Sequence, residues 1–97
     1  MITASITLQG QPEKRTEILQ TIKGIRDELA RDTRCRQVKV YQDLDDENTF
    51  FFVENWLTEH DLDAYLSSRL FKVLLGVTPI LREPLEIKLL TEIKNRI

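Results

Sequence analysis

The segment FFFVENWL, residues 50–57, limits what this chain can fold into more than any other part of it. Successive side chains of a β-strand point to opposite faces. In this segment both faces are mostly apolar: Phe50, Phe52, Glu54 and Trp56 form one face, and Phe51, Val53, Asn55 and Leu57 form the other. A strand of this kind needs a cover on each side, and a small chain has few elements that could supply two covers.

The segments before this strand predict a strand, a helix and a second strand. Residues 2–8 alternate apolar side chains with Thr and Ser, which is typical of a half-buried strand. The segment QGQPEK ends that strand, and Pro12 suits the first helical position because its missing N–H would be unpaired there anyway. Apolar residues then follow at helical spacing: Ile18, Ile22, Ile25 and Leu29. Gly24 lies within this helix, either because another backbone approaches it or as a tolerated weakness. Residues 34–42 predict the next strand, and DLDDEN predicts a solvated turn.

The segments after it predict a helix and a final strand. Thr58 is suited to cap a helix, with Asp61 completing a pair like a capping box. The helix continues to residue 75 with a bend near residues 67–68, and Gly76 and Pro79 end it. Residues 85–93 predict the last strand. The order β-α-β-β-α-β predicts an α+β, ferredoxin-like fold with an antiparallel four-stranded sheet and the helices on one face. Residues 1–97 suffice for one such domain.

The face of this sheet that carries no helices would leave the second apolar side of residues 50–57 without a cover. Phe51, Val53 and Leu57 would lie on it, and they would expose enough apolar surface to indicate an interface. A second copy of the sheet, packed face to face, would cover both chains at once. We therefore expect a homodimer through the open sheet face, with Asn55 forming hydrogen bonds across it. The alternative is a monomer whose third strand is central and unusually apolar.

Composition argues against several kinds of partner. The chain carries 14 basic and 16 acidic residues, a net charge of −2, which is unlike a nucleic-acid-binding surface. No segment approaches the ~18 apolar residues of a membrane helix, and the N-terminus lacks the features of a signal peptide. Cys35 is the single cysteine and has no internal disulfide partner. We expect a soluble, cytoplasmic protein that binds neither nucleic acid nor membrane.

The sequence contains no recognisable set of metal-ligating residues. His60 is the single histidine, and its place in the first turn of the predicted helix suggests that it faces solvent. One histidine makes no metal cluster, and DLDDEN lacks the glycine and the spacing of a calcium loop. We expect no metal site.

Four segments together give the chain a family resemblance. They are QPEKRTEILQTI, VYQDLDDENTFFFVENW, TEHDLDAYLSSRLF and EPLEIKLL, and the most telling part is Glu54-x-Trp56 followed by Leu62-x-x-Tyr65-Leu66 and Phe71. In order and spacing these segments resemble the antibiotic biosynthesis monooxygenase family. The resemblance implies a dimeric α+β barrel with a pocket in each subunit between sheet and helices. It also implies oxygenation of quinols or polyketide aromatics without metal or flavin, so we expect no cofactor.

The chain also departs from the family pattern. Tyr65 and Leu70 stand where many members carry histidines, Thr33-Arg34 replaces a Pro-Gly pair, and Val38 replaces an aromatic residue. Related small barrels degrade haem, which requires an axial histidine after the Phe71 position. The segment FKVLLGV has none, so we set haem aside.

Oxygenation without a cofactor needs a substrate that can become an electron-rich anion, and this requirement selects candidate residues. Glu54, pressed among aromatic rings, would have a raised pKa and could act as general base. Trp56 could offer a ring face and an N–H donor, and Tyr65 a hydrogen bond to the substrate. The candidate substrate-binding residues are Phe52, Leu62, Leu70 and Phe71. Each candidate also has a structural interpretation: Trp56 as core, Glu54 paired with a cation, and Tyr65 as core with its hydroxyl at the surface.

Three functions stay open on these grounds. The first is a cofactor-independent monooxygenase acting on a small aromatic or quinol-like substrate. The second is a dimer of the same fold that binds a small molecule, or acts in a stress response, without catalysis. The missing family histidines favour the second. The third is a regulatory ligand-binding domain, which here lacks an attached DNA-binding segment.

Overall fold

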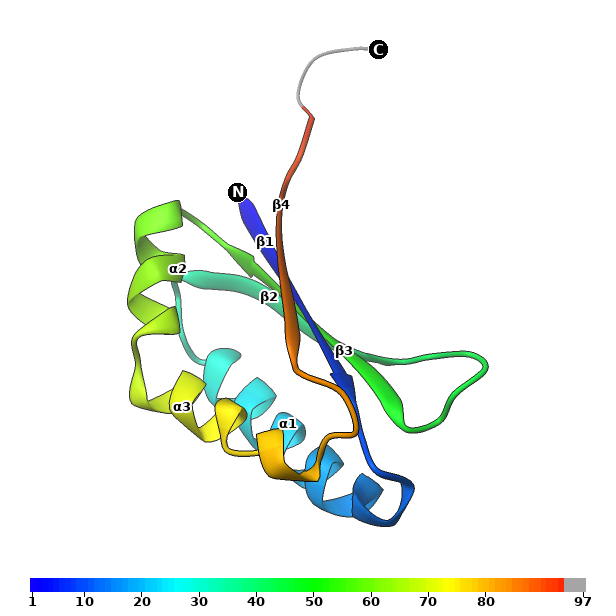
Figure 1. The fold of residues 1–97 in the computed structure, drawn as a ribbon. Coiled ribbons are helices and arrows are strands. Elements are labelled where there is room, and N and C mark those ends of the chain that lie inside the picture. The colour runs from blue at the N-terminus through cyan, green and yellow to red at the C-terminus, as the bar shows by residue number, and fades with distance from the viewer. Residues whose placement is uncertain (94–97) are drawn as a thin grey trace.

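The structure is a computed structural model that describes residues 1–93, and it confirms the predicted ferredoxin-like α+β fold. Its elements in order are β1 (Ile2–Gln9), η1 (Pro12–Lys14), α1 (Arg15–Leu29), β2 (Cys35–Gln42), β3 (Thr49–Trp56), α2 (Glu59–Leu66), α3 (Arg69–Leu75), η2 (Thr78–Ile80) and β4 (Glu86–Thr91). Figure 1 shows the helices on one side of the sheet. None of the helices within residues 1–93 has the length and apolar character required to span a bilayer.

The four strands form one antiparallel sheet in the order β2-β3-β1-β4. β3 and β1 are central and pair along their whole length, from Ile2 opposite Trp56 to Gln9 opposite Thr49. β2 and β4 are the edges, and β2 carries an irregularity between Cys35 and Gln37. Residues that pair directly share a face, so this register arranges the side chains in rows across the sheet.

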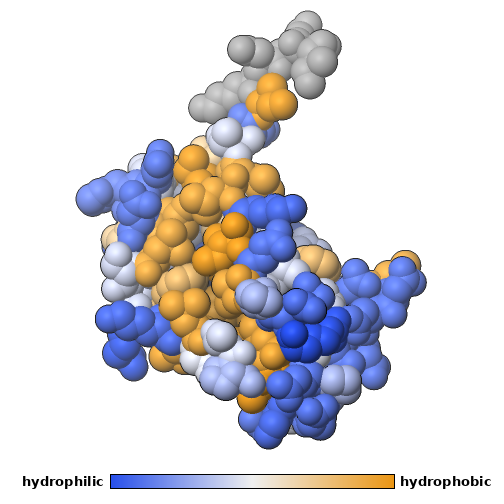
Figure 2. All heavy atoms as spheres, viewed as in Figure 1, coloured by the Kyte–Doolittle hydropathy of each residue, from blue (hydrophilic) through white to orange (hydrophobic). Residues whose placement is uncertain are grey.

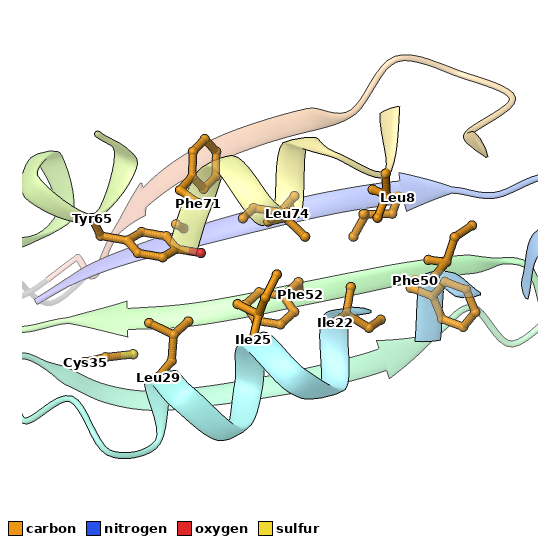
Figure 3. Packing of buried hydrophobic residues seen from close by; sticks show 14 of the residues in the cluster. Leu8, Ile22, Ile25, Leu29, Cys35, Phe50, Phe52, Tyr65, Phe71 and Leu74 are labelled. Atoms are coloured by element: carbon orange, nitrogen blue, oxygen red, sulfur yellow. The ribbon is translucent and has the colours of Figure 1, made fainter. Parts of the chain in front are cut away.

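The hydrophobic core lies between the sheet and the helices (Figure 3). Its fully buried members come from both layers: Ala4, Ile6, Leu8, Ile18, Ile22, Phe52, Trp56, Leu62 and Leu74. Burying a large apolar side chain of this kind contributes ~1.5–3 kcal/mol. The predicted stripe of α1 is part of this core, with Ile18, Ile22, Ile25 and Leu29 all buried. One face of residues 50–57 is therefore covered by the helices.

Gly24 does not serve a close backbone approach. A Cβ built on it would meet no atom within 4 Å outside the helix's own neighbouring backbone. Of the two interpretations that the sequence left open, close approach is wrong. Gly24 is a weakness of α1 that the rest of the fold tolerates.

The second helical region is two helices where the sequence predicted one bent helix. α2 ends at Leu66, and Ser68, with φ −82° and ψ 162°, leaves the helical conformation before α3 begins at Arg69. The Ser68 hydroxyl accepts a hydrogen bond from the Phe71 N–H at 3.2 Å, so it caps a new helix. Thr58 caps α2 as predicted and accepts from the Asp61 N–H at 3.1 Å.

The other face of the sheet carries no helix, as predicted (Figure 1). On it, Phe51 and Val53 are half-buried. Asn55 is satisfied within its own chain, because its Oδ1 accepts from the Thr3 hydroxyl at 2.7 Å and its Nδ2 donates to Gln37 Oε1 at 3.1 Å. The hydrogen bonds of Asn55 are therefore made within its own sheet, and the predicted bonds across a dimer stay a prediction.

β4 is shorter than predicted and is exposed along its whole length. Leu89 and Ile87 pair with Ala4 and Ile6, so they point to the helix side, yet the helices leave them accessible. In Figure 2, which has the same view as Figure 1, apolar atoms gather beside β4 on the surface that faces the viewer. The helical layer therefore does not cover the sheet as far as its β4 edge.

The loop before β4 is fastened to the turn between β2 and β3. Arg82 donates to the Gly10 carbonyl at 2.7 Å, to the Thr49 hydroxyl at 3.1 Å and to the Asp46 carboxylate. Asp46 also accepts from the Thr49 hydroxyl at 2.7 Å and the Asn48 N–H at 3.0 Å. This turn was predicted to be solvated. Leu44 in it is exposed, whereas Asp46 has a structural role.

Candidate active site

Glu54 is the one charged residue in the core of residues 1–93. It lies on the helix side of β3, between Val38 of β2 and Ala4 of β1, and its exposed fraction is 0%. Its Oε1 accepts a hydrogen bond from Trp56 Nε1 at 3.1 Å, and its Oε2 accepts one from the Tyr65 hydroxyl at 2.7 Å. Each carboxylate oxygen therefore has one donor, and both donors come from aromatic side chains.

Local structure explains why these three residues meet. The two-residue period of β3 places Glu54 and Trp56 on the same face. The Thr58 cap fixes where α2 begins, and Tyr65 lies on its buried face with Leu62. The rings of Trp56 and Tyr65 stack with their centroids 4.8 Å apart and an interplanar angle of 28°. Stacking of this kind holds the two donors in place around the carboxylate.

Burial is the main cause of the raised pKa values in the cluster of Glu54, Trp56 and Tyr65. Removal from water raises the pKa of Glu54 to about 7, although the hydrogen bonds from Tyr65 and Trp56 act in the opposite direction. Burial, and then the neighbouring Glu54 charge, raise the pKa of the Tyr65 hydroxyl. A carboxyl group with this pKa exchanges its proton near neutral pH, as a general base should.

Two structural interpretations of these residues are not met within residues 1–93. No Lys or Arg of that range forms an ion pair with Glu54. The hydroxyl of Tyr65 does not reach the surface, because it points into the core and donates to Glu54 (Figure 3). Trp56 is buried in the core, as its structural interpretation expected, and its Nε1 also donates to the Glu54 carboxylate.

The candidate substrate-binding residues differ in their positions. Phe52 and Leu62 are fully buried, and Phe71 is nearly so. The Phe71 ring meets the Tyr65 ring edge to face, with the two centroids 5.4 Å apart (Figure 3). Leu70 is half-buried and lines a separate groove of about 250 Å³ between α1 and α3. Phe71 is therefore next to Tyr65, which bonds Glu54, whereas Leu70 faces another part of the molecule.

The cluster is closed in this conformation. Two hollows of residues 1–93, the groove between α1 and α3 and a cavity of about 200 Å³ beside β4, are not lined by Glu54, Trp56 or Tyr65. A ligand would reach the carboxylate only if an aromatic side chain moved. Within residues 1–93 no group of three or more His, Cys, Asp and Glu side chains is arranged to hold a metal ion.

Sequence reasoning did not place Cys35 near the candidate site. Cys35 pairs with Trp56 across β2 and β3, and its thiol donates to the Gln37 carbonyl at 3.5 Å. Burial and the nearby Glu54 charge raise the pKa of the thiol to about 11, so it stays protonated and is a poor nucleophile. The register of the two strands, which the sequence alone does not fix, was the missing signal. His60 is exposed, as predicted.

Comparison with known proteins identifies solved structures of the same fold. The chain is similar to a conserved protein from Methanosarcina mazei Go1, at 27% identity and a TM-score of 0.84, covering 92% of this chain and 89% of that one. It is similar to an antibiotic biosynthesis monooxygenase at 17% identity and a TM-score of 0.88, covering 96% and 99%. It is similar to a protein from Pseudomonas aeruginosa at 17% identity and a TM-score of 0.83, covering 95% and 93%. No curated protein matches it.

The amino-acid sequence also matches the model of a protein family. The model described as antibiotic biosynthesis monooxygenase matches residues 1–75, more than half of the chain. The match spans β1 to α3 and includes Glu54, Trp56 and Tyr65. The chain belongs to the antibiotic biosynthesis monooxygenase family.

Proposed function

We propose that this protein is a cofactor-independent monooxygenase that acts on a small aromatic or quinol-like substrate. The observation that carries the proposal is the fully buried carboxylate of Glu54, held by two aromatic donors and free of any cation within residues 1–93. A buried carboxylate that is charged in the folded state is ordinarily paired with a cation or bound to a metal. A carboxylate kept without one, with its pKa raised to about 7, is suited to taking a proton at neutral pH.

Glu54 would act as the general base. The substrate hydroxyl takes the place of one aromatic donor at the carboxylate and gives its proton to Glu54. Trp56 offers its ring face to the substrate, and its N–H stabilises negative charge beside it. Tyr65 orients the substrate through its hydroxyl. Phe52, Leu62 and Phe71 form the apolar surroundings, and Leu70, which lines the groove between α1 and α3, would contact a ligand only from that side.

Oxygen would then react with the deprotonated ring. The anion gives one electron to O₂, and the resulting radical pair combines to form a C–O bond on a ring carbon. The hydroperoxide loses water, with the hydrogen of that carbon, and leaves a quinone that carries the new oxygen. One oxygen atom of O₂ ends in the product and the other in water. Hydroquinone would thus give hydroxyquinone and one water.

The working unit would be a homodimer through the open sheet face. Phe51 and Val53 lie half-buried on that face, and the neighbouring Leu57 is exposed. A second sheet would remove this apolar surface from water in both chains at once. A reducing, cytoplasmic location suits a buried free thiol such as Cys35.

A second function rests on a separate observation. The donors Trp56 and Tyr65 already occupy both oxygens of Glu54, and neither the groove between α1 and α3 nor the cavity beside β4 is lined by it. The same dimer could therefore bind a small molecule without transforming it. In that case Glu54 would serve the fold, and its replacement would change stability more than any ligand-dependent signal.

Oxygen uptake with a panel of hydroquinones separates the two functions. We expect turnover by the wild type and a loss of at least ~100-fold in Glu54→Gln, because general-base catalysis contributes at this scale. Trp56→Phe should also lower turnover. Asp63→Asn, which removes an exposed carboxylate of α2, is the matched control and should turn over as the wild type does. No turnover by the wild type, or full turnover by Glu54→Gln and Trp56→Phe, would contradict the proposal.

A further inference from the structure

A cavity beside β4 has no role in the function proposed for Glu54, Trp56 and Tyr65. It measures about 200 Å³ and is lined by Ile2, Glu59, Leu89, Leu90 and Thr91. It lies where the ends of β1 and β4 meet the first turn of α2. Leu89 is 55% exposed there although it points to the helix side of the sheet. The cavity is larger than the ~150 Å³ that suffices for a benzene ring.

The strand register connects this cavity to Glu54. On the helix side of the sheet, one row runs from Leu89 through Ala4 to Glu54, and the adjacent row runs from Thr91 through Ile2 to Trp56. Ala4 is the only residue between Leu89 and Glu54 in the first row. Its side chain is the smallest that β1 turns to the helices, where the others are Ile2, Ile6 and Leu8. The row that leads from the cavity to the carboxylate is therefore the one with the least side-chain volume.

Phe71 is an aromatic neighbour of Tyr65 that can move without breaking a hydrogen bond. Its ring lies edge to face on the Tyr65 ring, with the two centroids 5.4 Å apart. It is an apolar ring on α3, a short helix that Ser68 caps. Tyr65 and Trp56, in contrast, both donate hydrogen bonds to Glu54. A change of the Phe71 rotamer would therefore make room beside Tyr65 and leave both of these hydrogen bonds in place.

Within residues 1–93, the charged side chains along this route are both acidic. Glu59 lines the cavity and Glu54 lies at the inner end of the row, and no Lys or Arg of these residues lines the cavity. Carboxylates accept hydrogen bonds and repel anions. A ring that carries hydroxyl groups meets an acceptor at each end of the route. A ring that carries a carboxylate meets a like charge at the outer end.

We propose that the cavity lined by Ile2, Glu59, Leu89, Leu90 and Thr91 is the entrance of the ligand site, and that it admits uncharged hydroxylated rings across Ala4 while disfavouring aromatic carboxylates. This inference rests on the proposed function, because it takes the Glu54 cluster as the destination. It adds the direction of approach and a basis for selection. In the proposed route Phe71, the ring beside Tyr65, moves aside to admit the ligand.

Binding measured without oxygen tests the route. Trp56 is the only tryptophan, so its fluorescence reports on a ring that reaches the cluster. The probes are hydroquinone and 4-hydroxybenzoate, titrated anaerobically so that no turnover occurs. Leu89→Phe should weaken hydroquinone binding about tenfold, which is ~1.4 kcal/mol. Ile87→Phe is the matched control, because Ile87 is exposed on the same side of β4 but does not line the cavity, and it should bind as the wild type does.

The charge at the entrance is tested with the same probes. Glu59→Gln should raise the affinity for 4-hydroxybenzoate about fivefold, the scale of one exposed charge interaction, and leave hydroquinone binding unchanged. Hydroquinone binding that depends on Glu54 but is equal in wild type and Leu89→Phe would overturn the entrance and leave the proposed function intact. An unchanged preference in Glu59→Gln would overturn the selection. No binding of either ring would remove the proposed function and this inference with it.

Discussion

Glu54 and Asn55 are adjacent polar residues of β3, yet their environments are opposite. Glu54 points to the helices, is completely buried and is bonded by two aromatic donors. Asn55 points to the open face, is half-buried and is bonded by Thr3 and Gln37 of its neighbouring strands. The residue that can carry a charge is therefore the one shielded from water. Burying a carboxylate costs more free energy than burying a neutral amide. The arrangement thus lowers the stability of the fold but gives Glu54 a raised pKa.

The same comparison separates the two tasks of β3. The helix-side face of β3 contains Glu54, whose pKa lies near neutral pH. The open face of β3 contains apolar residues around Asn55, whose hydrogen bonds are already made. The first face is suited to chemistry and the second to packing against another sheet. The two faces can therefore be perturbed independently, and the expected effects differ in size.

The largest effect concerns the pH dependence of stability. The pKa of Glu54 is raised from 4.5 to about 7 in the folded chain, so the folded state binds more protons than the unfolded state between these values. The free energy of unfolding should therefore fall as pH rises from about 4.5 to about 7, by up to ~3 kcal/mol in total. Urea denaturation at a series of pH values measures this slope.

Replacements of single carboxylates assign that slope. Glu54→Gln should remove most of it, since the amide does not titrate. Glu59→Gln, at an exposed position of α2, should retain it. A slope that survives in Glu54→Gln would show that another group causes it, and Glu54 would then lose its support as a base near neutral pH.

The open face should respond to a change that the helix face does not feel. Val53 lies next to Glu54 in sequence and is half-buried on the open side. Val53→Lys places a charge in the proposed dimer interface and should weaken self-association about 30-fold, ~2 kcal/mol, because the charge loses its water. Val73→Lys on α3 is the control, and its association should equal that of the wild type. Sedimentation of a wild-type monomer at micromolar concentration would refute the dimer.

The strands and helical stripes could be predicted because each depends on a local period. Ile18, Ile22, Ile25 and Leu29 repeat at helical spacing, and the two faces of β3 follow from alternation alone. The bond between Tyr65 and Glu54 could not be predicted, because it depends on how α2 is rotated and seated over the sheet. The same holds for the cavity beside Leu89, because no local pattern states how far the helices extend over β4. The break at Ser68 was visible only as a bend, since serine favours caps but also occurs within helices.

A smaller effect should follow when the Tyr65 hydroxyl is removed. Tyr65→Phe keeps the ring stack with Trp56 but leaves Glu54 Oε2 without its donor at 2.7 Å. We expect a loss of about 1–2 kcal/mol at pH 8, where the carboxylate is charged. The loss should be smaller at pH 5, where Glu54 is protonated and needs less support. A loss that is equal at both pH values would mean that the hydroxyl does not sense the charge of Glu54.

The smallest effect is expected at the corresponding bond of the open face. Thr3→Val removes the hydroxyl that donates to Asn55 Oδ1 at 2.7 Å, a bond of the same length as that from Tyr65 to Glu54. In a Val53→Lys background that keeps the chain monomeric, water can reach half-buried Asn55 and replace the lost donor, so the cost should stay below ~0.5 kcal/mol. Urea denaturation of the double variant against Val53→Lys measures it. A cost equal to that of Tyr65→Phe would mean that bond length, and not burial, sets the energy of both bonds, and the distinction between the two faces of β3 would fail.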